Sequence, residues 1–153
     1  MPTVITEERP DTADAMQLIA ELTEDLNPTL YPQTSIHGYN VEKLIREGVH
    51  FFVLRQDGVP AGCGGVQFFG AEYGEVKRMY VRPPFRGQGL GRLILDHLAA
   101  CARQHGVSVL RLETGIYQLD AIRLYEHYGF QRIGPFGDYR EDQYSLYYEK
   151  RLV

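Results

Sequence analysis

Three glycines alternate with other residues in the segment RGQGLG (residues 86–91), directly before a run of helical periodicity. Glycine allows positive φ and lets a ligand approach the backbone without a Cβ in the way. Successive N–H groups in such a turn converge on an anion, and the helix that follows adds its free N–H groups and positive dipole end. Arg86 and Arg92 can add charge-assisted hydrogen bonds. The segment favours a phosphate or pyrophosphate site, and a tight turn without a ligand is the alternative.

Spacing tests this segment against two other phosphate-binding loops. A P-loop requires G-x-x-x-x-G-K-[ST], which the sequence does not contain. A dinucleotide loop requires G-x-G-x-x-G, but here Gly91 comes one residue early and Arg92 stands in the third glycine's place. Glu113, at the end of the next predicted strand, could still bind a ribose. An antiparallel hairpin expected before the loop argues against this dinucleotide-binding alternative.

The elements that must position the loop follow from hydrophobic periodicity and turn residues. Asp57-Gly58 between two apolar runs predicts a hairpin, and Asp11 is a candidate helix cap. We expect strands at 3–9, in both halves of 50–69, and at 73–81, 107–114, 130–136 and 143–153. We expect helices over about 12–27, 41–47, 90–105 and 119–128. This order, β-α-α-β-β-β-α-β-α-β-β, predicts an α/β fold with a mixed, mostly antiparallel sheet flanked by helices, as one domain over residues 1–153.

Two segments resemble the motifs of a known family. RGQGLG resembles the cofactor loop [RQ]-x-x-G-x-[GA] of the Gcn5-related N-acetyltransferases. AIRLYEHYGF (residues 121–130) is similar to that family's A-x-x-L-Y-x-x-x-G-F segment. The resemblance covers residues 51–136, and the two motifs in this order are far more specific than either alone. It implies the acyl-CoA N-acyltransferase fold.

The resemblance also implies an activity, which is acetyl transfer from acetyl-CoA to a primary amine of a small molecule or peptide, directly in a ternary complex. Loop N–H groups would hold the pyrophosphate, and the preceding strand would pair with the pantetheine arm. Gln118 stands where many relatives carry an asparagine that contacts the cofactor. The residues implied in cofactor binding are Met79, Tyr80, Val81, Arg86, Gly87, Gln88, Gly89, Leu90, Gly91, Arg92 and Gln118. A non-catalytic CoA-binding module is the alternative.

Two catalytic roles are implied. Tyr125 matches the family's tyrosine, which gives a proton to the departing CoA thiolate, and packing against the sheet is its alternative. For the base that deprotonates the amine, the candidate is Glu75, on the strand that ends at Val81. Glu113 or a chain of water molecules could take this role instead, and either carboxylate could simply be solvated.

Other chemistries have weaker support. Cys63 and Cys101 lie in apolar segments, so we expect them to pack rather than to form a covalent intermediate. The five histidines show no ligand spacing, so no metal is expected.

Two segments are candidates for the acceptor side. NPTLYPQTSIHGY (residues 27–39) is expected to line the acceptor site, with Tyr31, His37 and Tyr39 as possible contacts. PFGDYREDQYSLYYE (residues 135–149) is rich in tyrosine and acidic near its start. It could favour a cationic amine or form the edge of a homodimer.

Composition limits the partners. The formal net charge of −4 argues against a nucleic-acid partner, which usually demands a basic surface. We see no apolar run long enough to span a bilayer and no N-terminal signal-peptide pattern, so we expect no membrane partner and a cytoplasmic location.

Overall fold

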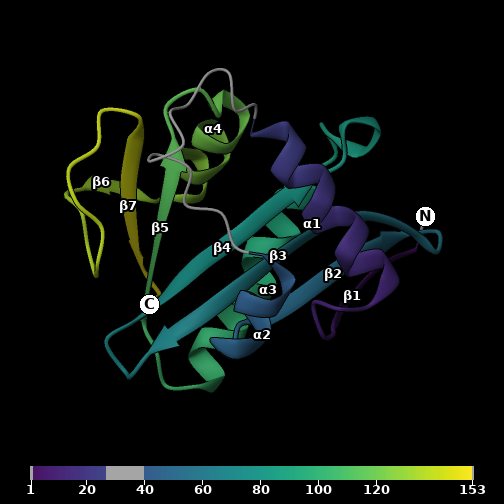
Figure 1. Ribbon diagram of the computed structural model, residues 1–153, viewed down its shortest axis with the longest axis horizontal. Coiled ribbons are helices and arrows are strands. Elements are labelled where there is room, and N and C mark those ends of the chain that lie inside the picture. Colours follow the sequence, from purple (N-terminus) through teal and green to yellow (C-terminus); the bar gives the residue numbers. More distant parts are fainter. Residues whose placement is uncertain (1, 27–39, 153) are drawn as a thin grey trace.

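Seven strands form one mixed sheet in the computed structural model, which describes residues 2–26 and 40–152 (Figure 1). The strands are β1 (Thr3–Glu7), β2 (His50–Gln56), β3 (Val59–Phe69), β4 (Tyr73–Val81), β5 (Val109–Gly115), β6 (Gln131–Ile133) and β7 (Ser145–Arg151). The helices are α1 (Ala13–Asp25), α2 (Val41–Arg46), α3 (Leu90–Gln104) and α4 (Leu119–Tyr128). The element order and the mostly antiparallel sheet confirm the prediction.

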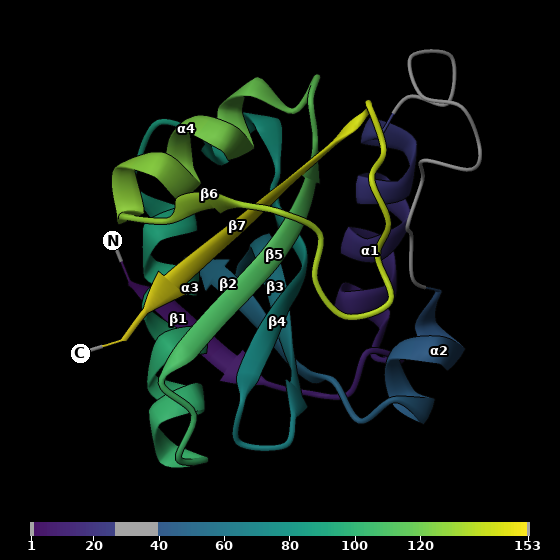
Figure 2. The same ribbon diagram turned by 90° about the vertical axis from the view of Figure 1, so that its left-hand side faces the viewer.

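The sheet is covered on both faces, because its strands carry apolar residues on each side. Helices α1 and α2 lie on one face, and α3 and α4 on the other (Figure 2). Leu18 and Leu44 pack with Phe51 and Val53 on the first face. On the second face Ile94, Leu95 and Leu98 of α3 pack with Leu110 and Leu112 of β5. Two separate apolar clusters therefore hold the sheet rigid between its helices.

Local signals set the turns and helix ends. Asp57 (φ 51°) and Gly58 (φ 79°) both adopt positive φ, as a two-residue hairpin turn of the mirror-image type requires, so the predicted β2–β3 hairpin is confirmed. The predicted cap of α1 is wrong by one residue. Thr12 accepts the hydrogen bond from the Ala15 N–H at 3.3 Å, because the Asp11 carboxylate is held by Arg9 at 3.0 Å.

Strands β4 and β5 are the parallel neighbours of the sheet, and they separate soon after they meet. Their register contains Gly74↔Leu110 and Glu75↔Arg111 alone. Beyond these pairs the strands spread apart toward α1 and α4 (Figure 1). All other neighbouring strands pair antiparallel. An opening between two central strands therefore lies where the glycine loop leaves β4.

An irregularity in β4 anchors α1 beside this opening. Arg78 has φ 55°, which is uncommon outside glycine, and the β3–β4 register shifts close to it. Its buried guanidinium donates to the Ile19 carbonyl at 3.0 Å and to the Thr23 Oγ1 at 2.5 Å. The bulge thus turns a basic side chain of β4 under α1 and fixes the distance between this helix and the sheet.

Candidate active site

The glycine loop leaves its backbone open to a ligand. Gly87 (φ 81°) and Gly89 (φ 76°) adopt positive φ, and a Cβ at either would have no atom within 4 Å. Gly89 is the N-cap of α3 and offers no side chain to the first turn. The free N–H groups of that turn therefore have room for an anion, as the sequence predicts.

The third glycine has a second reason to be small. A Cβ on Gly91 would lie 2.8 Å from Leu124 Cδ2 of α4. Gly91 therefore lets α3 approach α4 closely, which the sequence analysis did not foresee because the contact joins helices far apart in the chain.

Gly91→Val is expected to lower the free energy of unfolding by about 2 kcal/mol, as overpacking does. Urea unfolding would measure the change. Combining it with Leu124→Ala should remove most of this cost, because the smaller side chain makes room. An unchanged cost in the Leu124→Ala background would contradict the packing explanation.

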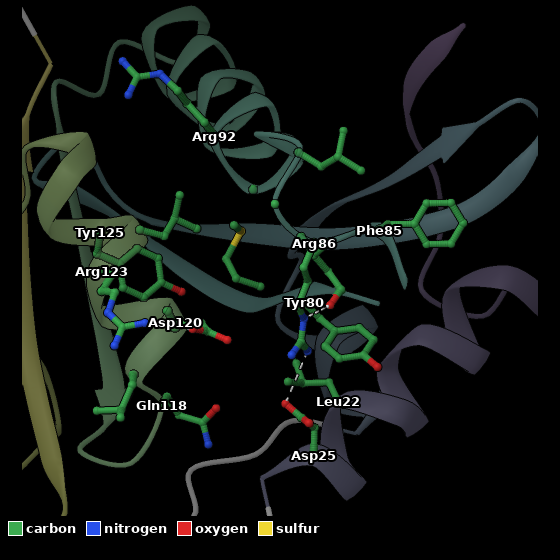
Figure 3. A pocket seen from close by; sticks show the side chains of 18 of the residues that line it. Leu22, Asp25, Tyr80, Phe85, Arg86, Arg92, Gln118, Asp120, Arg123 and Tyr125 are labelled. Atoms are coloured by element: carbon green, nitrogen blue, oxygen red, sulfur yellow. Dashed lines mark hydrogen bonds and ion pairs between the residues drawn. The ribbon is translucent and has the colours of Figure 1, made fainter. Parts of the chain in front are cut away.

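A pocket extends from the loop between the end of β4 and α4, and residues of α1 also line it (Figure 3). The predicted site residues that line it are Met79, Tyr80, Val81, Arg86, Gly87, Gly89, Leu90, Gly91, Arg92, Gln118 and Tyr125. Gln88, Glu75 and Glu113 are not among its lining residues. The Gln88 side chain instead accepts a hydrogen bond from Gln56 Nε2 of β2 at 3.0 Å. Only the backbone of Gln88 is therefore a candidate for phosphate binding.

Basic side chains surround the pocket. Arg86 donates from Nε to the Val81 carbonyl at 2.8 Å and approaches the Asp25 carboxylate of α1 at 3.8 Å (Figure 3). The guanidinium of Arg92 lies over the Tyr128 ring, 5.3 Å from its centroid. Arg123 of α4 also lines the pocket. The sequence did not predict this residue as part of the site, although its positive charge in the predicted helix 119–128 was a possible signal.

Tyr125 enters the pocket from α4. Its side chain is buried, and its hydroxyl points into the pocket (Figure 3). Burial, and then the nearby Glu113 carboxylate, raise the pKa of Tyr125 well above its ordinary value. The phenol therefore keeps its proton at physiological pH and is available as a donor.

Glu113 lies on β5, close enough to Tyr125 for its charge to raise the pKa of the phenol. Burial raises the pKa of Glu113 to about 7, and the Glu75 and Asp142 carboxylates add to the rise. A hydrogen bond from the Ser145 hydroxyl at 2.8 Å and the nearby Lys77 ammonium oppose it. A carboxylate that titrates near neutrality can exchange a proton at physiological pH.

Glu75 lies on β4 and is buried, whereas Glu113 is only partly buried. Its Oε2 accepts a hydrogen bond from the Tyr139 hydroxyl at 2.6 Å, and its Oε1 lies 3.6 Å from Lys77 Nζ. The two carboxylates predicted as candidate bases thus occupy neighbouring strands on either side of the opening.

Both cysteines are buried and lie outside the pocket lining, in agreement with packing. Burial raises the pKa of Cys63 to about 12 and that of Cys101 to about 11, so neither is a thiolate at neutral pH.

Within residues 2–26 and 40–152, no group of three or more His, Cys, Asp and Glu side chains could hold a metal ion. Over the same ranges no helix is long and apolar enough to cross a membrane. The predicted acceptor contacts Tyr31, His37 and Tyr39 lie outside the described residues.

Comparison with known proteins adds independent findings. The model of the Acetyltransferase (GNAT) family matches residues 16–130. The chain is 43% identical to an IAA acetyltransferase of Azospirillum brasilense, over 99% of this chain and 100% of that protein. It is 32% identical to the N-acetyltransferase YsnE of Bacillus subtilis, over 93% and 97% of the two chains.

Solved structures share the fold. A protein of Klebsiella pneumoniae, assigned as an acyl-CoA N-acyltransferase, has a TM-score of 0.83 at 34% identity, over 99% of this chain and 98% of that one. The PaiA N-acetyltransferase of Thermoplasma acidophilum, solved in complex with coenzyme A, has a TM-score of 0.79 at 18% identity, with 99% of each chain covered.

Proposed function

The chain belongs to the acetyltransferase (GNAT) family, and from this we propose that it transfers an acetyl group from acetyl-CoA to a primary amine. The observation that carries the proposal is the open glycine loop at the start of α3, joined by one pocket to the Tyr125 hydroxyl. The loop would bind the pyrophosphate through backbone N–H groups, and Arg86, Arg92 and Arg123 would supply positive charge.

The separation of β4 and β5 supports a place for the thioester. The pantetheine amides would pair with the free edge of β4 at Met79, Tyr80 and Val81, and the Gln118 amide would add a contact. A backbone N–H of β4 can then polarise the thioester carbonyl. In this arrangement the acetyl group would lie in the pocket, beside the end of β4 and Tyr125.

We further propose direct transfer, without an acylated protein intermediate. The two cysteines are buried, protonated and outside the pocket lining, which leaves no thiolate to accept the acetyl group. The amine nitrogen would attack the thioester carbon, the C–S bond would break, and Tyr125 would donate to the departing thiolate.

Between the two candidate bases, neither of which lines the pocket, the raised pKa of Glu113 favours that residue. Its pKa of about 7 suits a base that works near neutral pH. Its negative charge also raises the pKa of Tyr125, so the two groups are close to each other. Glu75 is bonded to Tyr139 and close to Lys77, which suits a role in shaping the charge around the acceptor. Glu75 as the base remains the sequence-based alternative.

The acceptor would approach from the face of α1 and α2. Residues 27–39, which the sequence assigns to that side, join α1 to α2. We propose a small-molecule or peptide amine as the acceptor. The name of the Azospirillum relative gives IAA as its acceptor, so IAA should be assayed beside the amines.

Calorimetric titration of the protein with acetyl-CoA tests this function, followed by release of CoA thiol in the presence of a panel of primary amines and IAA. Micromolar binding and turnover with at least one acceptor are expected. NAD serves as the control ligand. Absence of acetyl-CoA binding, or binding of NAD instead, would refute the proposal.

Tyr125→Phe is expected to lower kcat by about 100-fold while leaving the affinity for acetyl-CoA within a factor of two, because only the donor hydroxyl is lost. Stopped assays with the best acceptor and calorimetry give both values. Tyr128→Phe, which removes a tyrosine hydroxyl bonded to Asp96 at 2.7 Å on the same helix, is the matched control. Equal kcat values for wild type and Tyr125→Phe would remove Tyr125 from the mechanism.

A further inference from the structure

Each of the two candidate carboxylates accepts a hydrogen bond from a hydroxyl in the C-terminal part of the chain. Tyr139, in the connection between β6 and β7, donates to Glu75 Oε2 at 2.6 Å. Ser145, the first residue of β7, donates to Glu113 Oε2 at 2.8 Å. The connection between β6 and β7 lies beside the α1 face of the sheet (Figure 2). One segment thus holds both candidate bases, with a different hydroxyl for each.

Backbone hydrogen bonds hold the start of β7 in place around Ser145, whose hydroxyl also lies within hydrogen-bond reach of Tyr147. The Ser145 N–H donates to the Asp142 carbonyl at 3.1 Å, and the Ile116 N–H donates to the Tyr144 carbonyl at 3.0 Å. Ser145 pairs with Gly115 in the β5–β7 ladder, which makes it a diagonal neighbour of Glu113 on the same face. The residue is buried, so water does not compete freely for the hydroxyl.

Within the described residues, Ser145 is the one hydrogen-bond donor to Glu113, and the bond uses Oε2. Several charged or titratable groups face the same carboxylate. Glu75 and Lys77 come from β4, Asp142 from the β6–β7 connection, Tyr125 from α4 and Tyr147 from β7. The surrounding carboxylates disfavour the charged form of Glu113, whereas Ser145 and Lys77 favour it.

We propose that Ser145 is a positioning residue, whose hydroxyl orients the Glu113 carboxylate by holding Oε2 and so leaves Oε1 to take the proton of the acceptor amine. This inference rests on the proposed acetyl transfer with Glu113 as base. The proton passes from the amine nitrogen to Oε1 as that nitrogen attacks the thioester carbon. A hydrogen bond to one carboxylate oxygen fixes the plane of the carboxylate. The other oxygen then keeps one orientation toward the incoming amine.

A direct titration tests the contact without any acceptor. In protein labelled with ¹³C at the glutamate side-chain carboxyl, the Glu113 signal is assigned by its loss in Glu113→Gln. Ser145→Ala is expected to move the inflection of this signal up by about one pH unit, because a bond to the charged form is lost. Tyr139→Phe, which removes the hydroxyl bound to Glu75, and Ser145→Thr, which keeps a hydroxyl, should leave the inflection within a few tenths of wild type.

The pH profile of kcat/KM then tests the role. In Ser145→Ala the acidic limb should move upward by the same amount, and the rate at high pH should stay below that of wild type because the carboxylate is no longer held in one plane. Ser145→Thr should keep the wild-type profile, and urea unfolding of Ser145→Ala distinguishes this loss from a folding defect. An unmoved carbon inflection in Ser145→Ala, an equal shift in Tyr139→Phe, or a shifted inflection with an unmoved rate profile would each overturn the proposal. Failure of the wild type to bind acetyl-CoA would refute the function itself, and it is seen separately by calorimetry.

Discussion

Gly89→Glu is expected to weaken acetyl-CoA binding at least 100-fold, and calorimetry of the purified variant would measure the loss. A Cβ at Gly89 would have no atom within 4 Å, so a glutamate side chain there would enter the volume that we propose for the pyrophosphate. The glutamate also puts a negative charge at the N-terminus of α3, where the helix dipole and Arg86 should attract phosphate. Steric exclusion and like-charge repulsion act in the same direction.

The substitution also strains the backbone, so a matched variant is needed. A residue with a Cβ at φ 76° costs about 1–2 kcal/mol of stability. Gly58→Glu imposes the same residue at φ 79°, also with no atom within 4 Å, but in the β2–β3 turn outside the pocket lining. We expect Gly58→Glu to lose similar stability and to bind acetyl-CoA like wild type. Equal affinities in the two variants would show that the loop does not bind the cofactor.

Glu113→Gln is expected to lower kcat by about 1,000-fold, with acetyl-CoA affinity unchanged, because the amide cannot accept the proton of the amine. The amide oxygen can still accept the hydrogen bond from Ser145, so the change is close to isosteric. Glu75→Gln is the matched control, as it removes the other candidate carboxylate, on the neighbouring strand. A larger loss of kcat in Glu75→Gln than in Glu113→Gln would assign the base to Glu75.

The same substitution should stabilise the protein at alkaline pH. Because the folded-state pKa of Glu113 is raised to about 7 from 4.5, its contribution to stability is present below pH 4.5 and is lost as the pH rises through 7. Above neutrality the wild type therefore carries a cost of up to about 3 kcal/mol, which Glu113→Gln removes. Urea unfolding at pH 5 and pH 8.5 should show a gain that grows with pH. A gain that is independent of pH would contradict the raised pKa.

Taken together, the two results expected for Glu113→Gln describe a trade between stability and function. A carboxylate with a raised pKa lowers the stability of the fold above neutrality, and the proposed role of Glu113 as base is what would offset that cost. Glu75 and Asp142 contribute to that cost through their charge, and Ser145 and Lys77 offset part of it.

Local sequence determined most of the fold and the conformation of the glycine loop. The Asp57-Gly58 turn, the glycine loop before α3 and the apolar faces of the helices depend on residues close together in the chain, so periodicity and turn chemistry suffice to predict them. The α1 cap moved from Asp11 to Thr12 for an equally local reason, an ion pair with Arg9 that competes for the carboxylate.

Only the tertiary structure decided how the candidate catalytic groups are arranged. Gly91 meets Leu124, Ser145 meets Glu113 and Tyr139 meets Glu75 across elements separated by more than 30 positions in the chain. No periodicity encodes such contacts, because they depend on which strands become neighbours and where β4 and β5 part. The sequence by itself therefore predicted Tyr125 and two candidate carboxylates. What distinguishes Glu113 from Glu75 is the surroundings of each carboxylate, and these exist only in the folded chain.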